Sequence, residues 1–237
     1  MDGFQGKVKI FADGADKNDM LALNANVWVK GFTTNPTLMK KAGVKDYAQF
    51  AEDILKTIHD KPISFEVFAD DFNAMRKQAI KIAKMGAWVY VKIPITNTKG
   101  HSSEALIRDL SQEGVKLNVT AITTEKQVEK AARALELSPS AYVSVFAGRI
   151  ADTGVDPLPV MQSCMTILSS TPQLELIWAS PRELFNIIQA ESIGCHVITA
   201  TKDILNKMDL IGKDLEEYSL ETVKMFYNDA VNAGYVL

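Results

Sequence analysis

Eight short runs of β-branched and aromatic residues alternate with helix-forming segments along almost the whole chain. The runs predict strands at 9–13, 27–32, 63–68, 88–96, 115–120, 141–146, 174–179 and 195–199. The segments between them predict helices at 15–24, after an N-cap at Asp46 through about 58, from Asp70 to about 85, and at 101–112, 124–137, 159–168, 183–193 and 201–207. Strict alternation implies parallel strands joined by right-handed crossovers. Eight such units in 237 residues are expected to close into a barrel. The sequence therefore predicts an α/β protein: a single (β/α)8 (TIM) barrel domain over 1–237, with an additional C-terminal helix at about 214–233.

An open, doubly wound sheet is the alternative arrangement of the same elements. Sheets of that kind that bind nucleotides carry a glycine-rich loop after a strand. No predicted strand here ends in GxGxxG or GxxxxGK[ST]. The closed barrel is therefore the favoured prediction.

Composition and charge exclude several classes of function. With 47% hydrophobic residues, 23% charged residues and a net charge of -3, the chain resembles an ordinary globular protein and suggests neither a nucleic-acid nor a membrane partner. No apolar run approaches the ~20 residues of a membrane span, and the first residues lack the apolar core of a signal peptide. Cys164 and Cys195 form no CxxC pair and the histidines are scattered. We therefore expect a cytoplasmic protein with free thiols, no metal site and no cofactor.

The run at 88–96 contains a lysine, Lys92, within an otherwise apolar strand. A strand buried on both faces is usually apolar throughout, and a lysine there is costly unless it has a task. Burial disfavours the ammonium form of a lysine, and a neutral amine adds to carbonyl groups to form a Schiff base. The alternative is a lysine that extends its ammonium group into solvent at the strand end.

Polar side chains gather at the predicted carboxyl ends of the strands, where barrels of this type carry their chemistry. Besides Lys92 they are Asp13, Thr33, Thr34, Asn35, Glu66, Asn118, Thr120, Ser144, Arg149, Ser180 and Arg182. Each has an ordinary alternative: Asp13 could cap a helix, Asn35 could belong to a turn, Asn118 could pair with Thr120 in a filled barrel layer, and the arginines could lie on the surface. Glu66 is the hardest to explain in this way, because an acid inside an apolar strand needs a partner.

Together these groups predict cleavage of a ketose. Lys92 would add to the ketose carbonyl, and the protonated Schiff base would accept the electrons released when the bond between the third and fourth carbons breaks. Asp13 is the candidate base for the hydroxyl proton on the fourth carbon, and Glu66 with Thr120 would hold a water that shuttles protons. The other groups would bind substrate: a phosphate with Arg149 and Arg182, and sugar hydroxyls with Asn35, Asn118 and Ser144.

Several segments also resemble the transaldolase family, in order along the chain. They are Ala12-Asp13, FTTNPT at 32–37, VKIPIT at 91–96, NVT at 118–120, SVFAGR at 144–149 and ASPR at 179–182. The resemblance implies a class I enzyme that moves a dihydroxyacetone unit between sugar phosphates without a metal or cofactor. It implies catalytic roles for Lys92, Asp13, Glu66 and Thr120. The residues expected to contact substrate are Thr33, Asn35, Asn118, Ser144, Phe146, Arg149, Ser180 and Arg182.

Two positions bear on the subfamily, because the small bacterial members include fructose-6-phosphate aldolases. Glu66 and Phe146 resemble the transferase pattern, whereas the aldolase type has glutamine and tyrosine there. A phenol can donate a proton to the bound enamine, and phenylalanine cannot. One position departs from the family: Pro181 stands where phenylalanine is usual, and proline restricts the backbone before Arg182.

Three functions follow as alternatives. The first is a transaldolase of the pentose phosphate pathway, with sedoheptulose 7-phosphate or fructose 6-phosphate as donor and glyceraldehyde 3-phosphate or erythrose 4-phosphate as acceptor. The second is a lyase that releases free dihydroxyacetone, and the third is a barrel that only binds a sugar phosphate. The resemblance also implies a homo-oligomer in which the C-terminal helix packs on a neighbouring subunit. A helix covering its own barrel would have the same apolar face.

Overall fold

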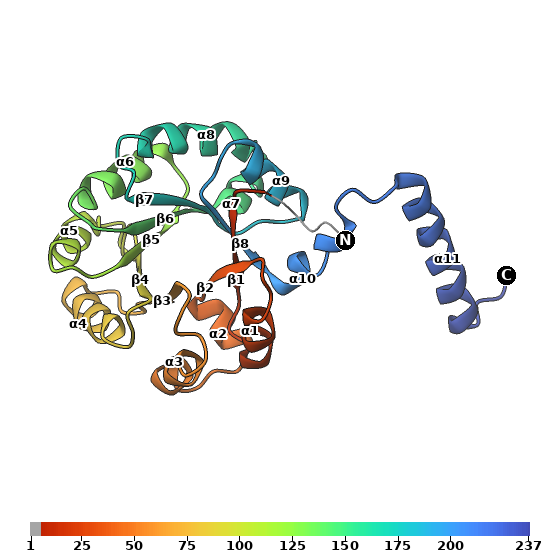
Figure 1. The fold of residues 1–237 in the computed structure, drawn as a ribbon, viewed down its shortest axis with the longest axis horizontal. Coiled ribbons are helices and arrows are strands. Elements are labelled where there is room, and N and C mark those ends of the chain that lie inside the picture. The colour runs from red at the N-terminus through yellow and green to blue at the C-terminus, as the bar shows by residue number, and fades with distance from the viewer. Residues whose placement is uncertain (1–5) are drawn as a thin grey trace. The chain divides into compact units, whose positions relative to one another are not determined.

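The computed structural model describes residues 6–237, which form two compact units, Gly6–Leu205 and Asn206–Leu237. The first unit is a closed barrel of parallel strands in the order β1-β2-β3-β4-β5-β6-β7-β8 (Figure 1). The strands are β1 (Lys9–Asp13), β2 (Val29–Thr33), β3 (Ile63–Glu66), β4 (Val89–Pro94), β5 (Leu117–Ile122), β6 (Ala141–Val145), β7 (Leu174–Trp178) and β8 (Val197–Thr201). The predicted (β/α)8 barrel is confirmed.

Helices surround the ring of strands in Figure 1. They are α1 (Lys17–Asn24), α2 (Pro36–Lys41), α3 (Tyr47–Leu55), α4 (Phe72–Ala83), α5 (Glu104–Gln112), α6 (Glu125–Ala134), α7 (Ala147–Ala151), α8 (Pro157–Leu168), α9 (Phe185–Ser192) and α10 (Lys202–Leu205). Most differ from the predicted bounds by a few residues at their ends. The short helices α2 and α7 are absent from the prediction.

The N-caps explain where several helices begin. Asp46 accepts a hydrogen bond from Gln49 N at 3.0 Å, so α3 starts where the sequence indicates. Asp71 rather than Asp70 caps α4, because Asp70 instead accepts hydrogen bonds from Thr98 in the loop after β4. The prediction that Asp70 opens this helix is therefore wrong by one residue.

An aromatic layer fills the barrel beneath its carboxyl end. Phe11 meets Tyr142 edge to face at 5.5 Å between ring centroids, and Tyr90 lies 4.5 Å from Tyr142. The Phe11 ring has room because β2 carries glycine opposite it: a Cβ at Gly31 would lie 2.6 Å from that ring. The layer closes the barrel interior, so polar groups at the strand ends have an apolar floor.

Trp88 corrects one detail of the predicted fourth strand. It precedes β4 and is 43% exposed, and Lys116 Nζ lies 5.5 Å from the centre of its ring. Trp88 therefore does not belong to the buried strand, which begins at Val89.

The second unit contains the expected C-terminal helix, α11 (Leu215–Ala233), and a short 3-10 helix, η1 (Met208–Leu210). Asp214 caps α11 by accepting hydrogen bonds from Glu216 N and Glu217 N, and Gly234 ends it with φ 67°. Among residues 6–237, no helix has the length and apolar character needed to cross a bilayer.

Candidate active site

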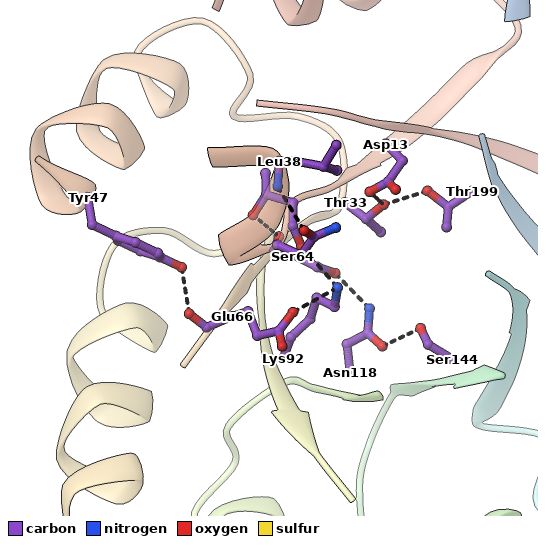
Figure 2. A network of polar contacts seen from close by, with 12 residues as sticks. Asp13, Thr33, Leu38, Tyr47, Ser64, Glu66, Lys92, Asn118, Ser144 and Thr199 are labelled. Atoms are coloured by element: carbon purple, nitrogen blue, oxygen red, sulfur yellow. Dashed lines mark hydrogen bonds and ion pairs between the residues drawn. The ribbon is translucent and has the colours of Figure 1, made fainter. Parts of the chain in front are cut away.

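Lys92 is buried inside the barrel at the carboxyl end of β4. Its side chain is 6% exposed, so it does not extend into solvent. Its Nζ donates to the Thr34 carbonyl oxygen at 2.9 Å and lies 3.1 Å from Glu66 Oε2 (Figure 2). Glu66 is the register partner of Lys92 on β3, which explains the acid within that apolar run. The carboxylate offers a site for a proton lost by the amine.

Asp13 ends β1 and is linked to two threonines. Thr33 Oγ1 donates to Asp13 Oδ1 at 2.7 Å, and it also shares a short hydrogen bond with Thr199 Oγ1 from β8. Burial raises the pKa of Asp13, while the nearby Lys92 charge and the Thr33 hydrogen bond oppose that rise. Asp13 does not cap a helix, because Asp16 caps α1. A partly buried carboxyl within the electrostatic field of a buried amine is suited to proton transfer.

A second buried network joins side chains of β3, β5 and β6. Asn118 from β5 is the register partner of Lys92. Its Nδ2 donates to Ser64 Oγ at 3.0 Å, and Ser144 Oγ donates to its Oδ1 at 2.7 Å (Figure 2). The amide is therefore fixed by neighbours on both sides. The alternative that Asn118 pairs with Thr120 is not what the structure shows.

Thr120 lies two residues beyond Asn118, on the same face of β5. It is 1% exposed, and its Oγ1 has no hydrogen-bond partner among residues 6–237. Buried hydroxyls in proteins are normally satisfied by protein, water or ligand. This oxygen is therefore suited to bind a water or a substrate hydroxyl.

Asn35 and Thr34 have structural partners. Asn35 Oδ1 accepts from Leu38 N at 3.0 Å and so caps α2, with Pro36 at the first position of the helix. Thr34 Oγ1 donates to the Ser64 carbonyl at 2.9 Å, which holds the backbone whose carbonyl contacts Lys92. The TTNP motif thus builds a helix start and also supplies an acceptor for the amine.

The two arginines lie apart from the hydrogen bonds around Lys92. The Arg149 guanidinium lies 5.8 Å from the centre of the Phe146 ring. Arg182 forms a two-point ion pair with Asp152, with Nε 2.9 Å from Oδ1 and Nη2 on Oδ2. The hydrogen bond from Arg182 lowers the pKa of Asp152. Neither arginine bonds to Lys92, Glu66 or Asp13 in the described part of the chain. The charges of Arg182 and Arg149 both lower the pKa of Asp152, so the two arginines lie around the same acid.

Ser180 precedes Arg182 in an unusual conformation. Its φ is 60°, in the left-handed region that few non-glycine residues adopt. Its carbonyl oxygen packs so closely on α7 that a Cβ at Gly148 would lie 1.6 Å from it. This contact brings the end of β7 against the start of α7.

The structure adds four residues that the sequence analysis did not select: Ser64, Thr199, Tyr47 and Asp152. Ser64 lies two residues before Glu66 on β3, so period-two spacing could have pointed to it, whereas β8 carries no predicted site residue that could point to Thr199. Tyr47 donates to the Glu66 carbonyl oxygen at 2.8 Å, and Asp152 holds Arg182. No sequence pattern signals those two long-range pairs.

Other reactive groups do not form a competing site. Burial raises the pKa of the Cys164 and Cys195 thiols to about 12. Within residues 6–237, no group of three or more His, Cys, Asp or Glu side chains is arranged to hold a metal ion.

The family described as Transaldolase/Fructose-6-phosphate aldolase matches residues 10–235. The chain belongs to this family. A "Probable transaldolase" of Thermoanaerobacter sp. (strain X514) is 34% identical over 220 residues, which cover 92% of this chain and 95% of the relative. A relative with the same description from Methanococcus maripaludis (strain C7) is 35% identical, and the match covers 85% of this chain and 89% of the relative. One from Clostridium acetobutylicum is 32% identical, and the match covers 95% of this chain and 100% of the relative. The chain is therefore an enzyme of the transaldolase type.

Solved structures of low identity share the fold. One described as "QR15, an Aldolase" superposes with a TM-score of 0.59 at 11% identity and covers 89% of this chain and 100% of its own. One described as "Native KDPGal structure" has a TM-score of 0.52 at 12% identity, with 84% of each chain covered. At these identities the similarity concerns the barrel and not the reaction.

Proposed function

We propose that this member of the transaldolase/fructose-6-phosphate aldolase family is a class I transaldolase that uses Lys92 as its Schiff-base lysine. The observation that carries the proposal is a buried amine held between the Glu66 carboxylate and the Thr34 carbonyl, with the partly buried carboxyl of Asp13 in its electrostatic field. An amine, a carboxylate that takes its proton and a second acid–base group are what imine formation and carbon–carbon cleavage require.

In the proposed reaction, Lys92 Nζ attacks the second carbon of the ketose and forms a carbinolamine. Loss of water, with proton transfer through a water held by Glu66 and Thr120, gives the protonated Schiff base. Asp13 then removes the hydroxyl proton on the fourth carbon. The bond between the third and fourth carbons breaks, its electron pair moves toward the iminium to form an enamine, and the shortened aldose leaves.

The second half of the reaction reverses these steps. The enamine carbon attacks the aldehyde of an acceptor, and Asp13 returns its proton to the new hydroxyl. Water then hydrolyses the Schiff base and releases the new ketose from Lys92. Asp13 must therefore act as a base in the first half and as an acid in the second.

We propose sugar phosphates as substrates: sedoheptulose 7-phosphate or fructose 6-phosphate as donor, and glyceraldehyde 3-phosphate or erythrose 4-phosphate as acceptor. Asn118 and Ser144 would bind the sugar hydroxyls, helped by Thr33, Asn35 and Ser180. The phosphate would bind Arg149 and Arg182, since a guanidinium grips phosphate with paired donors. For Arg182, the ion pair with Asp152 has to be exchanged for the substrate anion.

Transfer of the dihydroxyacetone unit to an acceptor is favoured over its release as free dihydroxyacetone because of two side chains near the proposed enamine. Phe146 packs against the barrel interior and offers no proton. Glu66 is held by the Lys92 amine. A lyase that releases free dihydroxyacetone is the second candidate, since it needs the same lysine and differs only in how the enamine is quenched. A barrel that only binds a sugar phosphate is the third.

We further propose that the chain acts as one functional domain in the cytoplasm, within the pentose phosphate pathway, and forms a homo-oligomer through α11. Leu220, Val223, Phe226 and Tyr227 recur at helical spacing and give α11 an apolar face. The two cysteines are free, which suits a reducing compartment. Light scattering of the full chain and of Phe226→Glu tests the oligomer: we expect the substitution to lower the mass to that of a monomer.

Reductive trapping tests the Schiff base. Borohydride added in the presence of fructose 6-phosphate should attach a three-carbon or six-carbon adduct to the peptide containing Lys92, as read by mass spectrometry. No adduct on Lys92 would support mere binding. Turnover measured with and without an acceptor aldehyde separates the other two candidates, because fast turnover without acceptor would identify a lyase.

A further inference from the structure

Two successive hydrogen bonds join three oxygen atoms from three strands and end at Asp13. Thr199 Oγ1 from β8 contacts Thr33 Oγ1 from β2, and Thr33 Oγ1 lies 2.7 Å from Asp13 Oδ1 on β1 (Figure 2). Thr199 and Thr33 are 4% and 2% exposed, so neither hydroxyl exchanges freely with bulk water. Hydrogen bonds in such surroundings are stronger and more directional than at a surface.

When Asp13 is ionised, the number of hydroxyl protons determines which group donates and which accepts in each of these two hydrogen bonds. A carboxylate only accepts, so the single hydroxyl proton of Thr33 must point at Asp13. Thr33 can then act only as the acceptor in its contact with Thr199, and Thr199 has to be the donor. The hydroxyl of Thr199 therefore favours the one orientation of Thr33 that stabilises the anion.

We propose that Thr199 is a positioning residue for Asp13, because its hydroxyl holds the Thr33 proton toward the Asp13 carboxylate. The inference rests on the proposed function only for its catalytic consequence. The arrangement serves a group that must be an ionised base at the start of the cycle. Without it, burial alone would keep Asp13 protonated to higher pH.

The charged groups that face Asp13 come from several elements. Lys92 on β4 stabilises its anion, and Glu66 on β3 opposes it. Asp13 also lines a cavity at the end of β1, between α1, α2 and α10. The other charged residues that line this cavity are Asp16, Asp19, Lys41, Lys202 and Asp203. Lys202 and Asp19 in that group form an ion pair at 2.5 Å. A substitution at Thr199 changes none of these charges, so its effect on Asp13 reports the hydroxyl.

Thr199→Val is the informative variant, because valine keeps the β-branched shape in a strand and removes only the donor. Thr199→Ser restores the hydroxyl and is the matched control. Thr33→Val removes the direct donor to Asp13 and should give the largest rise in the pKa of Asp13. Thr33→Val/Thr199→Val shows whether Thr199 acts through Thr33.

The primary measurement is the titration of the Asp13 carboxyl carbon by NMR in protein labelled with ¹³C-aspartate, assigned with Asp13→Asn. This readout needs no turnover. We expect Thr33→Val to raise the pKa of Asp13 by about one to two units and Thr199→Val to raise it by about 0.3–1 unit. Thr199→Ser should return it to the starting value. In the Thr33→Val background, Thr199→Val should add no further shift.

The acid limb of the kcat/KM profile should move to higher pH by the same amounts, because cleavage needs ionised Asp13. An unchanged Asp13 titration in Thr199→Val, or an equal shift with and without Thr33, would overturn the inference. If borohydride trapping of Lys92 failed in the unaltered protein while the NMR shifts appeared, the proposed reaction would be wrong and the role of Thr199 would stand.

Discussion

Asp13→Asn separates formation of the Schiff base from the cleavage that follows it. The substitution replaces one carboxylate oxygen by an amide nitrogen and keeps the side-chain size. The remaining amide oxygen can still accept from Thr33, which lies 2.7 Å from Asp13 Oδ1. Lys92 keeps its contacts with Glu66 and Thr34. The variant therefore removes a base and leaves the amine in place.

We expect a loss of cleavage of about 10²–10⁴-fold, the usual contribution of a positioned acid–base group. At about 1.4 kcal/mol for each factor of ten, this corresponds to about 3–5 kcal/mol in the barrier. Borohydride trapping with a ketose donor should still label Lys92, and the trapped species should be the uncleaved six-carbon adduct. Stopped assays for the aldose product and mass spectrometry of the adduct measure the two steps separately.

The same variant has a predicted effect on stability, with a defined sign. Burial raises the pKa of Asp13 above its unfolded value of 3.8, so ionising it costs stability at any pH above the folded pKa. That cost falls as the pH drops through the folded pKa and is absent below 3.8. Asp13→Asn should therefore melt at a higher temperature than the unaltered protein near neutral pH, and the difference should disappear in acid.

Asp16→Asn is the matched control. It removes an equal charge three residues away, and asparagine caps helices as well as aspartate, so α1 keeps its cap. It should change neither turnover nor trapping. The reasoning fails if Asp13→Asn turns over within tenfold of the unaltered protein, or if trapping falls in parallel with turnover.

The other predictions concern the lysine, the arginine site and the contact at the end of β7. Lys92→Met should abolish both the adduct and turnover while circular dichroism shows an intact fold; an adduct on another lysine would contradict it. Arg182→Ala should raise KM for phosphorylated substrates and leave KM for unphosphorylated sugars unchanged. Asp152→Asn should lower KM for phosphorylated substrates by no more than about fivefold, because the competing pair is exposed and such pairs are worth about 0.2–1 kcal/mol. An unchanged KM in both variants would remove Arg182 from the phosphate site. Gly148→Ala should cost about 1–3 kcal/mol or more in denaturant unfolding, because its Cβ would lie 1.6 Å from the rigid Ser180 carbonyl oxygen; unaltered stability would show that the β7 end can move away.

The barrel fold was predictable because the same sequence pattern, a strand followed by a helix, is repeated along the chain. Each apolar run is short and each is followed by a helical pattern, so an error at one boundary does not change the topology. Trp88 illustrates the limit: an aromatic residue next to a strand reads as part of it, although its ring packs under Lys116 at the surface. The short helices α2 and α7 were not predicted because they have too few residues to show the helical period of hydrophobic residues.

The central part of the site was predictable for a different reason. A lysine and a glutamate in buried strands are costly, and each explains the other once β3 and β4 pair in register. Hydroxyl residues such as Ser64 and Thr199 carry no such signal, because serine and threonine are common in strands. The orientation of Arg182 was not predictable either, since it depends on Asp152, which lies thirty residues earlier and meets it only in the folded chain.

Glu66, Lys92 and Asn118 occupy equivalent positions on three successive strands, as direct register partners. Sliding any one of these strands by a single residue would turn its side chain away from the other two. A partly assembled ring could thus retain much of its helix content and still be unable to capture a ketone. During refolding, the return of borohydride-sensitive labelling would mark the moment at which the strands reach their final alignment, later than the recovery of circular dichroism.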